Sequence, residues 1–202
     1  IINYRSSYAT STPETQISTS GTLFLSPKDP AKKWWSDTTR YDVTLSFVHK
    51  QKFGKIDMIA SGFFDKFEGP NQFTYYSRGR GNIRLRYRMQ ENLIFSLGGM
   101  INTGDNSSFF LWKNGTNGAM QAFSGTTSLR HATRIYVDPA VTYFDKYNNK
   151  HRLMARTIKI DNDNDNNQSN HSINHYLEYQ FQRDFEDAGL VLTTGAVGQW
   201  SK

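Results

Sequence analysis

Five arginines occupy alternate positions in the segment YSRGRGNIRLRYRMQ, residues 76–90. They are Arg78, Arg80, Arg84, Arg86 and Arg88. Alternate side chains of a β-strand point to the same face, so these guanidinium groups are expected to form one basic row. The positions between them carry Ser77, Gly79, Gly81, Ile83, Leu85, Tyr87 and Met89. The pattern therefore predicts a strand with one basic face, suited to anions or to paired carboxylates, and one mostly apolar face.

Three environments can accept this basic row. The lumen of a wide β-barrel accepts it at little cost, whereas arginines that face lipid cost a few kcal/mol each. A small eight-stranded barrel has room for it only if acids pair with the row, the candidates being Asp42, Asp57, Asp138 and Glu178. The other two environments are water beside a soluble sheet and the phosphates of nucleic acid. Because the nearby tyrosines mostly lie opposite the arginines, stacking and charge would not act together, and we expect no nucleic-acid partner.

A second candidate site is the aromatic segment NTGDNSSFFLWKNGTNGAMQAFSGTTSLRH, residues 103–132. It is rich in Gly, Asn and Ser, and its rings are expected to contact ligand from an outer loop: Phe109, Phe110, Trp112 and Phe123. Exposed rings stack on the CH faces of sugars or on siderophores. The alternative is that these rings cap a barrel, or belong to two further strands at 107–113 and 119–124.

The sequence gives little support for a metal site, a cofactor or an enzyme activity. Asp161, Asp163 and Asp165 alternate as in a calcium loop, but Asn166 and Ser172 stand where an EF-hand needs Gly and Glu. We therefore expect a solvated outer loop there, with weak calcium binding as the alternative. The chain has no cysteine, which excludes disulfides and thiolate sites. No HExxH, GxSxG or Walker motif is present, so we expect no cofactor, no catalytic residue and no enzyme activity.

Alternation with period two is the main pattern along the chain, and it predicts an all-β fold. About eight strands in four hairpins are expected at 40–48, 55–64, 74–88, 92–101, 134–143, 151–160, 172–183 and 190–200. Short turns near residues 52, 90, 147 and 186 contrast with long outer loops at 65–73, 102–132 and 161–171. Residues 1–39 form an irregular lead-in, with 19–25 as a candidate strand, and residues 40–202 form the wall. This asymmetry predicts an antiparallel meander of transmembrane hairpin strands, part of a larger outer-membrane barrel.

The amino-acid composition agrees with a sheet that has one face in contact with water. Hydrophobic residues make up 37% of 202 residues, less than in an average globular chain, while 14% are aromatic. The net charge of +6 suits nucleic acid, anionic lipid headgroups or an acidic ligand as a partner, and it equally suits a solvated basic surface with no partner. The chain begins with Ile1 and ends at GQWSK, and we expect it to be an interior piece of a longer protein.

Two segments resemble the barrel of TonB-dependent outer-membrane receptors of the Bacteroidetes type, including the SusC-like group. The first is KDPAKKWWSDTTRYDVTLSFVHKQKFGKIDMIASGFF, residues 28–64, with a Pro and Trp-Trp loop and a KFGKID hairpin. The second is RIYVDPAVTYFDKYNNKHRLMARTIKIDNDNDNNQSNHS, residues 134–172. They cover about a third of the chain. The family's plug, TonB box and aromatic C-terminal strand end have no counterpart in this sequence.

The resemblance implies a 22-stranded barrel in the bacterial outer membrane that imports a scarce ligand such as a siderophore, haem, glycan or peptide. Its implied partners are outer-membrane lipid, the plug of the same parent chain, TonB through parts outside this chain, and the ligand. Replacing Arg84 and Arg86 with Glu is then expected to weaken plug seating or ligand entry. The alternative is a soluble all-β module that binds a ligand or glycan.

Overall fold

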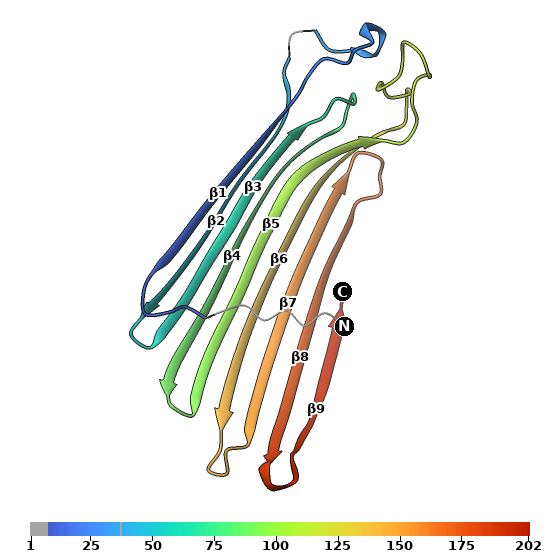
Figure 1. Cartoon of the computed structure of the whole chain (residues 1–202). Helices are drawn as coiled ribbons and strands as arrows, with labels where there is room; N and C mark the ends of the chain where they lie inside the picture. Colours follow the sequence, from blue (N-terminus) through green and yellow to red (C-terminus); the bar gives the residue numbers. More distant parts are fainter. Residues whose placement is uncertain (1–7, 37) are drawn as a thin grey trace.

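The computed structural model describes residues 8–36 and 38–202 and contains one nine-stranded antiparallel sheet (Figure 1). Each strand pairs with its neighbours in the sequence, in the order β1 to β9. The strands are β1 (Glu14–Phe24), β2 (Arg40–Phe53), β3 (Ile56–Glu68), β4 (Tyr75–Gln90), β5 (Leu93–Phe109), β6 (Thr127–Phe144), β7 (Lys150–Asn164), β8 (Asn170–Phe185) and β9 (Leu190–Ser201). Two short 3-10 helices, η1 (Pro30–Lys32) and η2 (Glu186–Ala188), lie in the connections. The predicted all-β antiparallel meander is confirmed.

β1 lies within the segment that was predicted as an irregular lead-in. It pairs along its whole length with β2, from Glu14 opposite Lys50 to Phe24 opposite Arg40. The lead-in at 1–39 is therefore only partly irregular, and the sheet has nine strands where about eight were expected. Serine and threonine occupy both faces of this segment, ETQISTSGTLF, and so hide the alternation. Residues 1–7 and 37 of the lead-in lie outside the described residues.

The outer loops are shorter than predicted. The loop at 65–73 begins only after Glu68, the loop at 102–132 shrinks to 110–126, and the loop at 161–171 shrinks to 165–169. Backbone pairing continues past the last apolar side chains, because the ladder hydrogen bonds need no apolar residue. Hydrophobic alternation therefore marked the apolar part of each strand and missed the polar extension.

The two faces of the sheet differ sharply in chemistry. The register sets Leu85 of β4 opposite Leu97 of β5 on one face, and Arg86 opposite Ser96 on the other. The first face, here called the apolar face, exposes large hydrophobic side chains on every strand, among them Ile17, Leu45, Phe64, Ile83, Leu97, Val137, Leu153, Leu177 and Leu192. Among the described residues, Trp35 is the one buried hydrophobic side chain. Within residues 8–36 and 38–202, no second layer covers the apolar face, whereas a soluble sheet buries its apolar face on another layer.

The apolar side chains form a band of limited height. In β5 the band runs from Leu93 to Ile101, and then Thr103 and Asp105 follow on the same face. In β6 it runs from Tyr143 to Ile135, directly opposite, and then Thr133 and His131 follow. The band is thus about nine residues high, close to the 9–11 residues with which a tilted strand crosses a bilayer.

The strands are staggered. One ladder row joins His49 of β2 to Trp200 of β9, through Ala60, Ile83, Gly99, Val137, Thr157 and His175. Beyond this row β2 runs about four residues to its short turn, whereas β9 runs about ten. The short turns therefore shift steadily along the strand direction from β2 to β9. At 3.3 Å per residue and 4.8 Å per strand step, this shift means that the strands are inclined by about 30° to the perpendicular of the line that joins the turns. Barrel strands are tilted by a similar angle.

None of the helices in the described ranges is long and apolar enough to cross a membrane.

Candidate functional site

The arginine row lies on the face opposite the apolar band, here called the polar face. Arg78 donates from Nε and Nη2 to Oδ2 of Asp65 at 3.0 and 2.7 Å. The Thr44 hydroxyl donates to the other carboxylate oxygen at 3.1 Å. Asp65 is buried, so these hydrogen bonds compensate a carboxylate that has lost its water.

A second carboxylate, that of Asp57, lies close to two arginines of the row. Arg86 Nη1 and Arg88 Nη2 lie 4.0 and 3.7 Å from Oδ2 of Asp57. Asp57 is only 4% exposed, and its Oδ2 makes no hydrogen bond within the described residues. The attraction between Asp57 and these two guanidinium groups is therefore electrostatic, at a distance longer than a hydrogen bond.

The acids proposed from the sequence behave differently from one another. Asp57 pairs with the row, but Asp138 forms a two-point pair with Arg156 of β7, with both contacts at 2.6 Å. Glu178 accepts a hydrogen bond from Tyr176 at 2.6 Å, and Asp42 makes no salt bridge among the described residues. The partner that sequence reasoning missed is Asp65, because it was assigned to the outer loop at 65–73. The hairpin register of β3 against β4 would have found it.

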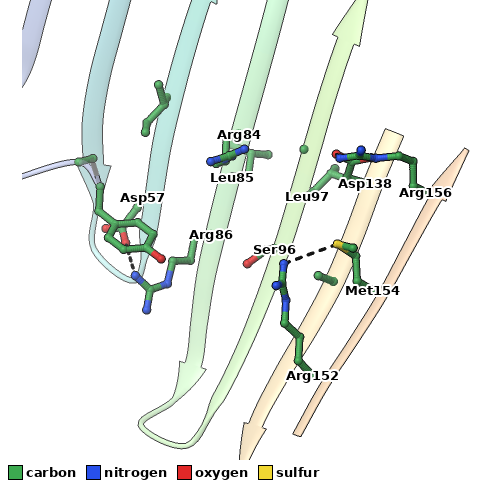
Figure 2. Close-up of a pocket in the computed structure, with 15 residues that line it drawn as sticks. Asp57, Arg84, Leu85, Arg86, Ser96, Leu97, Asp138, Arg152, Met154 and Arg156 are labelled. Carbon is green, nitrogen blue, oxygen red and sulfur yellow. Dashed lines mark hydrogen bonds and ion pairs between the residues drawn. The ribbon is translucent and has the colours of Figure 1, made fainter. Parts of the chain in front are cut away.

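The polar face is hollowed in two places. A cavity of about 220 Å³ lies between Asp57 and Arg86 on one side and Asp138 and Arg156 on the other, with Arg152 on the β7 side (Figure 2). The Tyr8 ring covers the Arg86 guanidinium, 4.2 Å from the ring centre. A second hollow of about 480 Å³ is lined by residues from β1 to β6. One hollow can touch six successive strands only if this face is concave.

The aromatic loop lies at the long-loop end and forms a small hairpin of its own. Trp112 pairs with Ala122, Lys113 N donates to Gln121 O at 2.9 Å, and Phe123 N donates to Leu111 O at 2.9 Å. The alternative of further extended segments is therefore correct in part, although they pair over only a few residues.

The four predicted ring contacts do not form one cluster. Phe109 packs edge-on against Trp112, with centroids 5.1 Å apart, while Phe110 is 77% exposed. Phe123 is also exposed. A shallow hollow of about 610 Å³ beside Trp112 is shared with Lys32, so it joins this loop to η1. The rings are accessible, as ligand contacts require.

The aspartates of the weak calcium alternative do not form a metal loop. Asp161 and Asp163 lie in β7 on the apolar face above the band, and Asp165 lies in the following turn. The Lys159 ammonium, 2.8 Å away, and His171, at 3.0 Å, hold the pKa of Asp161 below its usual range. Within residues 8–36 and 38–202, no group of three or more His, Cys, Asp or Glu side chains is arranged to hold a metal ion.

Comparison with protein-family models, with curated proteins and with solved structures gave no match for this chain.

Proposed function

We propose that this chain is a wall segment of a bacterial outer-membrane β-barrel of the TonB-dependent receptor type, with a transport role and no chemistry of its own. The observation that carries the proposal is the uncovered apolar band on one face of a nine-stranded, staggered sheet. Nine residues at 3.3 Å, inclined by about 30°, span about 26 Å along the barrel axis. The lipid-facing band of outer-membrane barrels is about 25 Å tall.

The polar face supports the same proposal. A concave face that carries Arg78, Arg80, Arg84, Arg86 and Arg88 is suited to a wide, wet lumen, with the apolar face in lipid. Among the strands of the described residues, the edge strands β1 and β9 each pair on one side only, so further strands can extend the wall on both sides. Short turns at one end and longer connections at the other are typical of these barrels.

The receptor type rests on the resemblance of residues 28–64 and 134–172 to Bacteroidetes-type receptors. The ligand is then a scarce solute, and the outer loops and lumen face supply its contacts. Outer-membrane lipid and a plug domain of the same parent are the other partners.

Extraction of cell envelopes with urea and alkaline carbonate tests the membrane part of this proposal. An integral barrel stays in the pellet and migrates faster on gels when it is not boiled, whereas a soluble glycan-binding module is released. Release of the intact protein by urea would refute the wall assignment. Loss of ligand uptake on depletion of TonB, with the protein still in the membrane, is the result expected for the receptor type.

A further inference from the structure

The arginines of the polar face differ in their partners. Arg78, Arg86, Arg88 and Arg156 face carboxylates, as described above. Arg80 instead donates from Nε to the amide oxygen of Asn102 at 3.2 Å. Within the described ranges, Arg134 of β6 makes no hydrogen bond or ion pair, and it is exposed. Arg80 and Arg134 are thus two cations on this face without a salt bridge to an acid, and Lys52, Arg130 and Arg152 share this property on other ladder rows.

Arg80 and Arg134 lie on one ladder row. Arg80 is opposite Asn102 in the β4–β5 pairing, and Asn102 is opposite Arg134 in the β5–β6 pairing. Strands lie about 4.8 Å apart, so the two arginine Cα atoms are about 10 Å apart, and both side chains can reach a group above Asn102. The Asn102 oxygen accepts from Arg80, which leaves its amide nitrogen as a third donor. We call Arg80, Asn102 and Arg134 the donor row.

The donor row stands at the rim of the larger hollow. One alternation step toward the short turns, the next row carries Asn82, Met100 and Tyr136. Asn82 and Tyr136 line the hollow of about 480 Å³, together with Gln16 and Ser61. This volume is in the range of small-molecule sites, and these side chains offer amide and hydroxyl groups.

We infer that the donor row and this hollow form a binding site for a polar small molecule that carries an oxyanion, in chemical class a sugar acid. The carboxylate or sulfate group binds to the guanidinium groups of Arg80 and Arg134 and to the Asn102 amide. The hydroxylated body of the ligand lies in the hollow. Three donors without an acidic partner complement one oxyanion, and charge-assisted hydrogen bonds of this kind are the strong ones. This deepens the proposed function, because it names the class of ligand that the polar face holds.

The substitution Asn102→Asp gives the sharpest test. The new carboxylate keeps the size of the side chain and lies between the two arginines, where it takes the place of the ligand's oxyanion. We expect at least a ~10-fold loss of affinity with the fold retained, since one charge-assisted contact is worth about that factor. The full-length protein is purified from its membrane in detergent, and calorimetry measures binding of digalacturonate, a sulfated disaccharide and a neutral disaccharide.

The double variant Arg80→Gln/Arg134→Gln removes the charges and keeps hydrogen-bonding groups. It should lose binding of both anionic sugars by roughly 10- to 100-fold. Arg183→Gln, which removes one charge from the opposite face near the β8–β9 turn, serves as a control for a change in charge away from the donor row and should bind like the unaltered protein. The two anionic probes separate a carboxylate ligand from a sulfate ester.

Selective binding of an anionic sugar that Asn102→Asp abolishes is the expected result. Equal affinity for acidic and neutral sugars, binding unchanged in Asn102→Asp, or no binding of either anionic probe would overturn the inference. Heat-modifiable migration and resistance to urea extraction are measured on each variant. These two measurements test whether the protein is an integral barrel. They therefore distinguish failure of the proposed function from failure of the inferred binding site at the donor row.

Discussion

Leu97 and Ser96 are neighbours in β5, yet they lie on opposite faces of the sheet. Leu97 lies in the apolar band, opposite Leu85 and Pro139, whereas Ser96 lies on the polar face opposite Arg86 and lines the smaller cavity. The same backbone and the same ladder hydrogen bonds hold both residues. The difference between the two faces is therefore a property of side-chain placement alone, and single substitutions on either face can test it.

The largest effect is expected for Leu97→Arg compared with Ser96→Arg. In the proposed barrel the apolar face meets lipid, where an arginine near the middle of the band costs about 2–4 kcal/mol, whereas a lumen position tolerates an arginine. The free energy of unfolding in lipid vesicles, measured by urea titration, should fall for Leu97→Arg and stay near the starting value for Ser96→Arg. Equal losses for the two variants would mean that the faces do not meet different media.

The next effect concerns the paired cations of the polar face. Asp138→Ala leaves Arg156 without its two contacts of 2.6 Å, and we expect a loss of about 1–3 kcal/mol in the free energy of unfolding. The Arg156 side chain is 43% exposed, so water reaches the guanidinium that has lost its partner and keeps the loss toward the lower end of this range. A double-mutant cycle with Arg156→Ala isolates the pair, and a coupling energy near zero would contradict this reading.

Outside both faces, the β6–β7 turn should respond to acid. Asp145 accepts hydrogen bonds from Asn149 Nδ2 and N and from Tyr147 N at 2.8, 2.9 and 2.8 Å, and the Asn149 side chain leads in lowering its pKa from 3.8 to about 2. A depressed pKa gives stability that is complete above pH 3.8 and is lost as the pH falls through 2. The protection of the Tyr147 and Asn149 amides, measured as the exchange rate relative to an unfolded peptide at the same pH, should therefore fall between pH 4 and 2, and unchanged protection would refute this role. In Asp145→Ala this protection should be low at every pH.

The smallest effect is expected at the edge of the sheet. Glu14 and Lys50 form a contact of 3.4 Å, but Glu14 is 58% exposed. Exposed pairs contribute about 0–1 kcal/mol, so Glu14→Gln should change the free energy of unfolding by less than about 0.5 kcal/mol. A loss as large as that of Asp138→Ala would show that the edge is covered in the intact protein.

Sequence alone predicted the features that repeat every second residue. The arginines at 78–88 lie on one face, the four short turns were located, and eight of the nine strands were found in order. These features depend on local alternation, which the sequence displays directly. The strand β1 was only a candidate within the lead-in, because Thr and Ser suit either face and give no contrast.

What the sequence did not reveal depends on register. The pairing of Arg78 with Asp65, and of Arg156 with Asp138, joins residues on different strands, and a shift of one residue would separate them. Asn102 was not predicted as a binding residue, because an asparagine next to a loop is common and indicates no particular function. Asn102 becomes a candidate binding residue because Arg80 and Arg134 lie on either side of it, and this arrangement follows only from the strand register.

The purely sequential order of the strands has a consequence for folding. Every strand pairs with the strands just before and just after it, so each contact closes a short loop and the contact order is low for a β protein. Hairpins can then join the edge of a growing sheet one after another, each using the previous strand as its template. Removing one hairpin, for example β6 and β7, would leave β5 and β8 antiparallel to each other and with the same faces available. A meander can thus change its width by two strands while its apolar and polar side chains stay on the same two faces.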